Sequence, residues 1–323
     1  MTPAFQILAN GADASGAIRD RLISLEAIDE DGLKSDRLEI ELDDRDGRIE
    51  WPELDARLEL SLGHVETGLT PIGVYAVDGV SGEGPGQTMR ISATAADMKS
   101  AARAPRTRAW RDVSLADIVR TIAAEAGLEA VVGESLAAIR WPYIAQTAES
   151  NLHLLTRLAG PLDATAKPAG GKLVVQRRGE GKTAAGDAIA PVALSRARLV
   201  SWRWQLGERE KYVCVEAEWS DIGAGATRKI VVGKGEPKRR LRHVYATEAE
   251  ARRAARGELD LAGRSALQLS GDVAGFEPGL FAGGTLRISD LRPELSGDWQ
   301  VTRVAHRLGA GLATSFDARK AQE

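Results

Sequence analysis

The chain has 323 residues, 43% hydrophobic and 28% charged, a composition that indicates a soluble globular protein with room for two or three domains. Its 43 basic and 46 acidic residues give a formal charge of −3, which disfavours a protein that wraps nucleic acid or adheres to membranes. We expect no membrane-spanning run and no export signal. The single cysteine, Cys214, excludes an internal disulfide and a zinc site built from several cysteines.

Residues 5–98 are expected to form antiparallel strands. Around residue 40, three apolar side chains (Leu38, Ile40 and Leu42) alternate with charged ones, which is typical of a strand with one buried face. The strands are separated by segments rich in Asp and Gly at 29–32, 43–47 and 81–86. Short strands with such breaks suggest a barrel or a sandwich.

A second block is expected after the basic, proline-containing segment Lys99–Asp112, which we interpret as a link. Ser114 is placed to cap an amphipathic helix that ends at Gly127. A second helix is predicted at 149–160, with an apolar stripe of Leu152, Leu155 and Leu158, followed by a strand that ends near Gly179. The Ala- and Gly-rich segment 180–191 predicts a connecting loop.

Strands are expected to resume from about residue 192, and Cys214 is interpreted as a strand residue rather than a nucleophile. Thr247 and Glu250 have the spacing of a capping box in front of an amphipathic helix, at about 247–263. The segment Gly297–Ala318 alternates apolar and polar residues on both sides of a glycine-rich turn, which predicts a closing hairpin.

The predicted fold class is therefore α+β and mainly β. Two β-barrel-like domains, at residues 1–100 and 181–323, are linked by a small α+β domain at 101–180, and the second barrel-like domain carries the embedded helix. The two flanking domains share no visible repeat, but they are expected to have similar folds.

Motifs that carry enzyme chemistry are absent from the sequence. It contains no phosphate-binding G-x-x-x-x-G-K-[ST], no G-x-S-x-G, no H-E-x-x-H and no complete calcium loop. The partial Asp spacing at 43–47 is expected to be a solvated turn, and the basic run Pro237–His243 a solvated or partner-facing loop. The four histidines occupy different elements without neighbours at ligand spacing: His64, His153, His243 and His306. We therefore expect no catalytic residue, no cofactor and no metal.

Five fragments in order resemble a known family. They are DRLEIELDDRDG with ARLELSLG, SLADIVRTIAAEAGL, IAQTAESNLHLLTRLAGPLDA, YATEAEARRAARGEL, and FAGGTLRISDLRPELSGDWQVTRVAHRLGAGLATSFDA. In this order, over about residues 36–318, the chain resembles the phage late-control protein D family. That family comprises baseplate hub proteins of contractile tails and is related to the N-terminal hub region of VgrG proteins.

The resemblance implies a structural role rather than an enzyme. We expect a homotrimeric ring that adapts a six-fold tail tube to a three-fold spike, in the virion's tail baseplate after assembly in the host cytoplasm. The expected partners are a separate trimeric spike protein, the tube or a tube-initiator protein, other baseplate proteins, and DNA only as cargo in the channel, with no membrane. Five residues are assigned structural roles: His306, Trp299, Gly297, Thr247 and Glu250. His306, beside Val304 and Leu308, is expected to lie in a scaffold hairpin rather than to act as a base.

Three other readings of the sequence stay open. A tail-associated peptidoglycan hydrolase would need a catalytic insert, and residues 99–180 are rich in Leu rather than in acidic residues. A regulator of late transcription conflicts with the negative charge and with the lack of a helix-turn-helix. A ligand-binding β protein would use Trp202, Trp204 and Trp219 to line a pocket, although Trp in strands usually belongs to the core.

Overall fold

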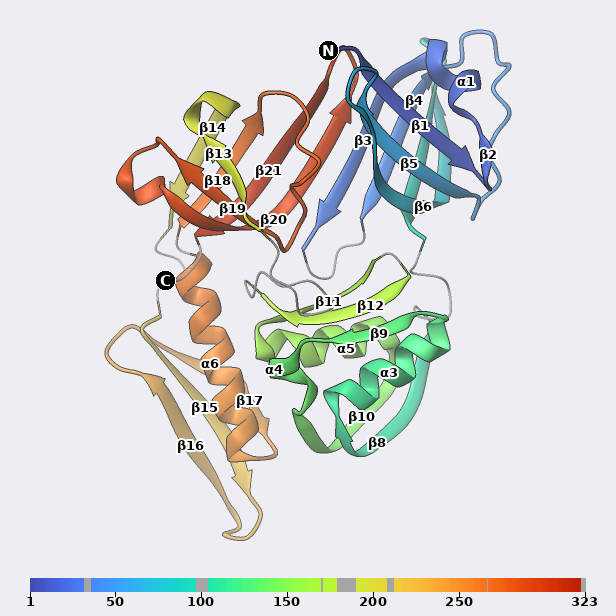
Figure 1. Cartoon of the computed structure of the whole chain (residues 1–323). Helices are drawn as coiled ribbons and strands as arrows, with labels where there is room; N and C mark the ends of the chain where they lie inside the picture. The colour runs from blue at the N-terminus through green and yellow to red at the C-terminus, as the bar shows by residue number, and fades with distance from the viewer. Residues whose placement is uncertain are drawn as a thin grey trace.

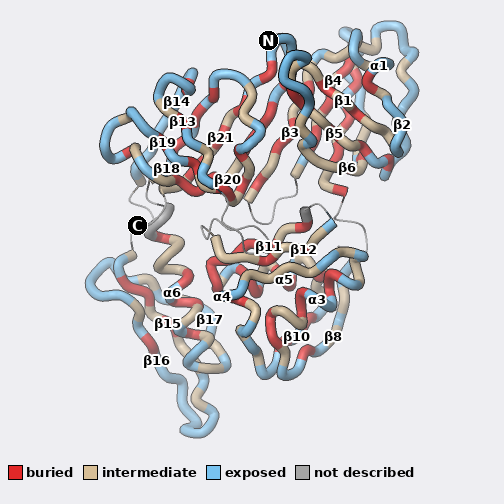
Figure 2. Tube along the Cα trace, viewed as in Figure 1, coloured by how far each residue is buried: buried red, intermediate tan, exposed pale blue. Residues whose placement is uncertain are grey.

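The computed structural model describes residues 1–31, 36–96, 104–169, 171–178, 190–207, 212–265 and 267–320. A long, twisted sheet occupies one side of the molecule, and two smaller α+β units lie beneath it (Figure 1). Buried residues gather inside the sheet halves and inside each small unit, so the protein has several cores rather than one (Figure 2). The predicted loop at 180–191 lies almost entirely outside the described residues.

The first half of the long sheet comes from the N-terminal residues. Its strands are β1 (Pro3–Ala9), β2 (Ala12–Asp13), β3 (Leu22–Glu30), β4 (Arg37–Asp43), β5 (Arg57–His64), β6 (Gly68–Glu83) and β7 (Thr88–Ala95), with the short helix α1 (Ser15–Ile18) and a 3₁₀ turn (Arg19–Arg21) between β2 and β3. They pair in the order β3-β4-β7-β6-β5-β1-β2. Leu38, Ile40 and Leu42 are all buried on one face of β4, which confirms the alternation predicted for this strand.

The second half comes from the C-terminal part of the chain. Its strands are β13 (Val192–Ser195), β14 (Leu199–Leu206), β18 (Leu267–Val273), β19 (Thr285–Ser289), β20 (Gly297–Leu308) and β21 (Leu312–Lys320), with 3₁₀ turns at Arg196–Arg198 and Pro293–Leu295. The main order is β14-β18-β21-β20, and β19 joins β20 while β13 runs parallel to β19. The predicted hairpin is confirmed, since β20 and β21 pair up to Leu308 and Leu312 around the glycine turn.

The two halves are joined edge to edge. β20 pairs antiparallel with β3, from Arg303 opposite Glu30 to Leu308 opposite Leu25, so the halves form one thirteen-stranded sheet. This corrects the expectation of two barrel-like domains: the pairings among described residues follow an open path from β14 to β2 and close no barrel. The physical reason is that one edge of β20 is shared: Gly297–Gln300 pair with β19, whereas Arg303–Leu308 pair with β3, so the second half opens toward the first along this edge.

The middle unit contains β8 (Pro105–Ser114), α3 (Leu115–Ala126), β9 (Glu129–Val132), α4 (Glu134–Ala137), β10 (Arg140–Ser150), α5 (Asn151–Ala159), a 3₁₀ turn (Gly160–Leu162), β11 (Ala164–Ala169) and β12 (Lys172–Arg177). The prediction for α3 is confirmed: Ser114 caps it reciprocally with Asp117, and Gly127 ends it at a positive φ of 70°. Helix α5 begins two residues later than predicted, because Ser150 caps it by accepting the N–H of His153.

Part of the predicted link is a strand. β8 pairs with β10, so residues 105–112 belong to the fold of the middle unit, whereas 97–103 lie outside the described residues. One basic residue of this segment packs within the middle unit: the Arg108 guanidinium binds Glu125 at 2.6 Å and lies 4.2 Å from the centre of the Trp110 ring. The prediction of a link is therefore wrong for residues 105–112, where charged residues alternate along a strand.

A separate unit interrupts the second half of the sheet. It contains β15 (Cys214–Asp221), β16 (Ala226–Gly233), β17 (Lys238–Tyr245) and α6 (Glu248–Ser265), with a small core of its own around Val215 and Ala251. The embedded helix predicted in the second barrel-like domain is thus real, but it covers this three-stranded sheet rather than the long one. Cys214 is a buried strand residue, as predicted.

Candidate functional site

The end of β3 is the place where the long sheet and the middle unit meet. The Lys167 ammonium group of β11 donates to a carboxylate oxygen of Asp29 and lies 2.8 Å from a carboxylate oxygen of Asp36. The other oxygen of Asp29 accepts the backbone N–H of Ala282, at 2.7 Å, from the second half of the sheet. One partly buried ion cluster (Asp29, Asp36 and Lys167) therefore connects the first half, the second half and the middle unit.

The electrostatics of this ion cluster depend on its burial. Burial raises the pKa of the Asp36 carboxyl to about 6, and the negative charge of Asp29 adds to the shift. Burial disfavours the charge of Lys167, but the carboxylates of Asp29 and Asp36 outweigh it and raise the pKa of the ammonium group. At neutral pH the lysine therefore keeps its charge and balances two close carboxylates.

A second ion pair strengthens the same junction. Arg178, just after β12, lies 3.2 Å from a carboxylate oxygen of Asp31, and the backbone N–H of Asp31 donates to the carbonyl of Thr302. Arg178 thus connects the middle unit to the end of β3, and the Asp31 N–H bond connects that end to β20 within the long sheet.

His306 lies near this junction, on β20, where it faces Ala27 of β3 and Thr314 of β21. Its Nδ1 is 3.0 Å from the Thr314 hydroxyl, which also accepts the backbone N–H of Glu277. The hydroxyl hydrogen is then available to Nδ1, and the ring packs edge-on against Phe276, with centroids 5.2 Å apart. Burial lowers the pKa of the imidazole to about 4, although Asp29 acts in the opposite direction. The ring is therefore neutral at pH 7.

The other sequence-predicted residues lie in two distant places. Trp299 is fully buried on β20, and its indole N–H donates to the carbonyl of Leu295 at 2.9 Å. Gly297 begins β20 with a φ of 102°, a conformation that favours glycine. Thr247 caps α6 by accepting the N–H of Glu250 at 3.2 Å, while the Glu250 carboxylate reaches back to the N–H of Ala246. Trp299 and Gly297 belong to β20 of the long sheet, as His306 does, whereas Thr247 and Glu250 lie at the start of α6. The five residues therefore form no single site.

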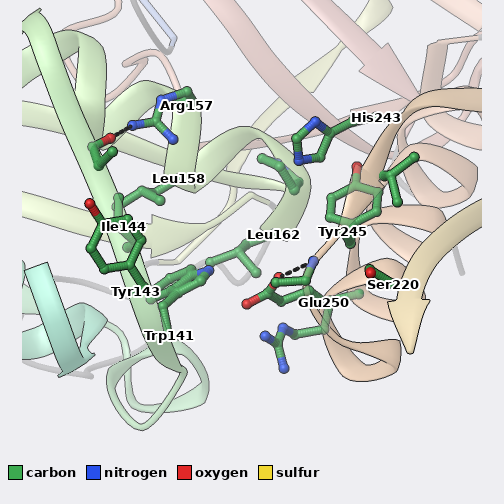
Figure 3. Close-up of a pocket in the computed structure, with 15 residues that line it drawn as sticks. Trp141, Tyr143, Ile144, Arg157, Leu158, Leu162, Ser220, His243, Tyr245 and Glu250 are labelled. Carbon is green, nitrogen blue, oxygen red and sulfur yellow. Dashed lines mark hydrogen bonds between the residues drawn. The ribbon is translucent and has the colours of Figure 1, made fainter. Parts of the chain in front are cut away.

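A cleft of about 690 Å³ separates the middle unit from the β15–β17 unit (Figure 3). Aromatic side chains line both walls, with Trp141 and Tyr143 from β10 on one side and Tyr245 from β17 on the other (Figure 3). The walls meet where Gly257 of α6 packs against the 3₁₀ turn after α5: an added Cβ would lie 2.5 Å from the carbonyl oxygen of Pro161. A glycine in mid-helix is explained by this close approach.

Metal and membrane sites receive no support from the part of the chain that the structure describes. Its side chains include no group of three or more His, Cys, Asp or Glu placed to hold a metal ion. None of its helices combines the length and hydropathy needed to cross a bilayer.

Comparison with known proteins identifies the family. The sequence matches the family described as "Phage tail baseplate hub (GPD)" over residues 81–312. The chain belongs to the phage tail baseplate hub family. It is similar to the probable baseplate hub proteins of Escherichia phages 186 and P2, each 29% identical over 98% of this chain and over 92% and 93% of the relative, respectively.

Solved structures share the fold of the baseplate hub. The 43 kDa tail protein of prophage MuSo2 from Shewanella oneidensis superposes with a TM-score of 0.74 at 14% identity, over 98% of both chains. The Escherichia coli c3393 protein, a component of the type VI secretion system, gives a TM-score of 0.61 at 10% identity, over 100% of this chain and 78% of that one. A chain of the Francisella PdpA-VgrG complex gives a TM-score of 0.57 at 8% identity, over 98% of this chain and 52% of that one, which confirms the expected VgrG-like relationship at the level of fold. Family membership makes the hub a component of the tail baseplate in the virion.

Sequence reasoning missed the ion cluster at the end of β3. The acidic segment 29–32 was interpreted only as a turn, whereas Asp29 and Glu30 end β3 and residue 32 lies outside the described residues. A signal was present, since charged residues that end an otherwise alternating strand often have partners elsewhere. Their partner, Lys167, is 138 positions away, and no local pattern connects them.

Proposed function

We propose that this hub is the symmetry adaptor of the baseplate. Three copies would form a ring around a central channel, with a six-fold tail tube on one side and a separate three-fold spike on the other. Two similar sheet halves in each of three copies present six related surfaces to the tube, while the whole ring keeps three-fold contacts for the spike.

One observation carries this proposal: the two halves share one order of strands. With the two-residue strand β2 left aside, the first half has the order β3-β4-β7-β6-β5-β1 and the second half has the order β14-β18-β21-β20-β19-β13. Counted along the chain, both orders are the second, third, sixth, fifth, fourth and first strands of their half. The halves differ at one end, where β13 runs parallel to β19 but β1 runs antiparallel to β5.

The proposed role needs binding surfaces rather than an active site. The partners we propose are the spike, the tube or its initiator, other baseplate proteins, and DNA that passes through the channel. The domain limits near residues 100 and 180 are likewise proposed, with the two halves as the repeated units and the middle unit between them in the chain. In this scheme His306 stabilises the junction and takes no part in catalysis.

Electron microscopy of the purified hub mixed with its spike tests the proposal. End-on views should show a ring with a central hole, and light scattering should give three hub chains for each spike trimer. One hub chain per spike trimer, or no binding at micromolar concentration, would count against the adaptor role. Lysis of cell walls by the hub alone in a zymogram would instead indicate a hydrolase.

A further inference from the structure

Strand β14 at one end of the long sheet has an unusual surface. Trp202, Trp204 and Leu206 project from one face, where their exposed fractions are 37%, 45% and 61%. Trp202 lies opposite Gly271 of β18, and Trp204 lies opposite Leu269. On β18 both Gly271 and Leu269 are buried. The face that forms the core of the second half thus continues onto β14 without a covering layer.

An exposed edge of this kind is expected to meet another chain. Among the described pairings, β14 bonds only to β18, so its outer edge carries backbone groups that point away from the sheet. Tryptophan is also the residue type most enriched at the centres of protein interfaces. The sequence left a ligand pocket and a core as the two expected places for Trp202 and Trp204, whereas in the single chain both side chains are exposed.

Basic side chains surround these tryptophans. The Arg196 guanidinium lies 5.7 Å from the Trp202 ring centre, and that of Arg292 lies 5.6 Å from the Trp204 ring centre. Arg203 is exposed on the opposite face of the same strand. Arg292 is paired with Glu294, whereas within the described residues no carboxylate is paired with Arg196 or Arg203.

The opposite end of the sheet carries a loop of complementary character. Between β4 and β5, Trp51 is 78% exposed and Leu54 is 66% exposed. Three acidic residues (Glu50, Glu53 and Asp55) lie among them, and all are exposed. The loop leads directly into β5, two strands from the end of the sheet, so it lies far from β14 (Figure 1).

The two halves as a whole also carry opposite net charges, acidic for the half with the loop 50–55 and basic for the half with β14. Residues 1–96 hold 19 acidic and 8 basic side chains, whereas the second half, at 190–207 and 267–320, holds 6 acidic and 9 basic ones. Two first halves, or two second halves, from different copies carry like net charges and repel each other. The acidic first half of one copy attracts the basic second half of another. Charge therefore favours a head-to-tail contact between copies over a symmetric one.

We propose that the apolar strip of β14 (Trp202, Trp204 and Leu206), with its arginines, is the docking surface for the acidic loop 50–55 of the next copy of this chain. The inference rests on the proposed ring and names the contact that closes it. A head-to-tail contact uses two different surfaces per copy, and it ends in a closed ring only when the rotation between copies divides a full turn.

Disulfide trapping in the full-length chain tests this contact. A chain carrying both Leu54→Cys and Trp204→Cys is oxidised in solution and separated by denaturing electrophoresis. We expect covalent species that stop at three chains. The wild-type chain, whose single Cys214 is buried, and a chain carrying Leu54→Cys with Ile222→Cys on the exposed β15–β16 turn should remain monomeric. Thermal melting of each chain shows that it is folded.

The possible outcomes distinguish a failure of the proposed contact from a failure of the proposed trimeric ring. Cross-linking that continues past three chains supports the contact and refutes the trimer. A wild-type chain that forms trimers by light scattering, without cross-links between positions 54 and 204, refutes the contact and leaves the adaptor role standing. Neither cross-links nor trimers, alone or with the spike, would overturn both.

Charge reversal provides a second measurement that misfolding cannot imitate. Arg196→Glu and Glu53→Arg are each expected to weaken association about tenfold, because Arg196 lies beside Trp202 and like charges then face each other at the contact. The chain that carries both changes should recover most of the lost association. Equal weakening in the double variant would refute the complementary pairing of these two ends.

Discussion

The ion cluster of Asp29, Asp36 and Lys167 gives the sharpest prediction. Lys167→Met removes the only cation of the cluster among the described residues and leaves two carboxylates close together under the long sheet. Breaking a buried ion pair usually costs about 3–5 kcal/mol. The three side chains keep 20–28% of their exposure, so we expect a loss of about 2–4 kcal/mol in the free energy of unfolding at pH 8.

The loss should depend on pH in a defined direction. The pKa of Asp36 is raised to about 6, so between pH 4 and 6 the folded chain binds more protons than the unfolded chain, and this group favours folding as the pH falls. In Lys167→Met the protonation of Asp36 also removes the repulsion from Asp29. The destabilisation should therefore be smaller at pH 5 than at pH 8.

Urea unfolding, followed by tryptophan fluorescence and circular dichroism at both pH values, measures the effect. Lys172→Met is the matched control, because Lys172 lies on the adjacent strand and pairs with Glu129 at 3.4 Å on the surface. This control should change the free energy of unfolding by at most about 1 kcal/mol. A Lys167→Met chain as stable as the control, or destabilised equally at pH 5 and pH 8, would refute the reasoning.

Three further predictions concern single residues. His306→Asn should lower the free energy of unfolding by about 1–3 kcal/mol at pH 7. Because burial lowers the pKa of the imidazole to about 4, the wild type loses stability as the pH falls from 6.5 to 4, and thermal melts should show the difference in melting temperature between wild type and variant becoming smaller over that window. Glu125→Ala leaves the Arg108 guanidinium without its carboxylate and should lower the free energy of unfolding, measured in urea, by about 2–4 kcal/mol. Glu125→Gln should recover part of this loss, since it can still bond to Asn151, and an equal loss in both variants would contradict the charge argument. Gly257→Ala should lower the melting temperature, because the new methyl group meets the carbonyl of Pro161, although alanine ordinarily stabilises a helix by about 1 kcal/mol over glycine.

Local patterns predicted those elements whose structure depends on neighbouring residues. The caps of α3 at Ser114 and Gly127, the buried face of β4 and the β20–β21 hairpin all follow from side chains within a few positions of each other. Family membership was also readable, because five ordered fragments persist over most of the chain. In these cases the sequence alone contained the deciding interactions.

The polar network of the middle unit shows where such patterns stop. Gln146 is fully buried and accepts from both Arg108 and Trp110, while its amide donates to Asn151. Each of these residues is ordinary on a surface strand or helix end, and only the pairing of β8 with β10 brings them together. The same pairing turned a predicted link into a strand.

Tertiary structure alone decided how the parts are joined. Periodicity shows which face of a strand is buried, but not which edge it bonds along, so the β3–β20 contact that merges two expected barrels into one sheet has no local signal. For the same reason the partnership of Asp29 with Lys167 and the exposure of Trp204 could not be read from neighbouring residues. Burial and ion pairing between segments more than a hundred residues apart depend on the path of the whole chain, and in this hub those long-range contacts form the candidate site.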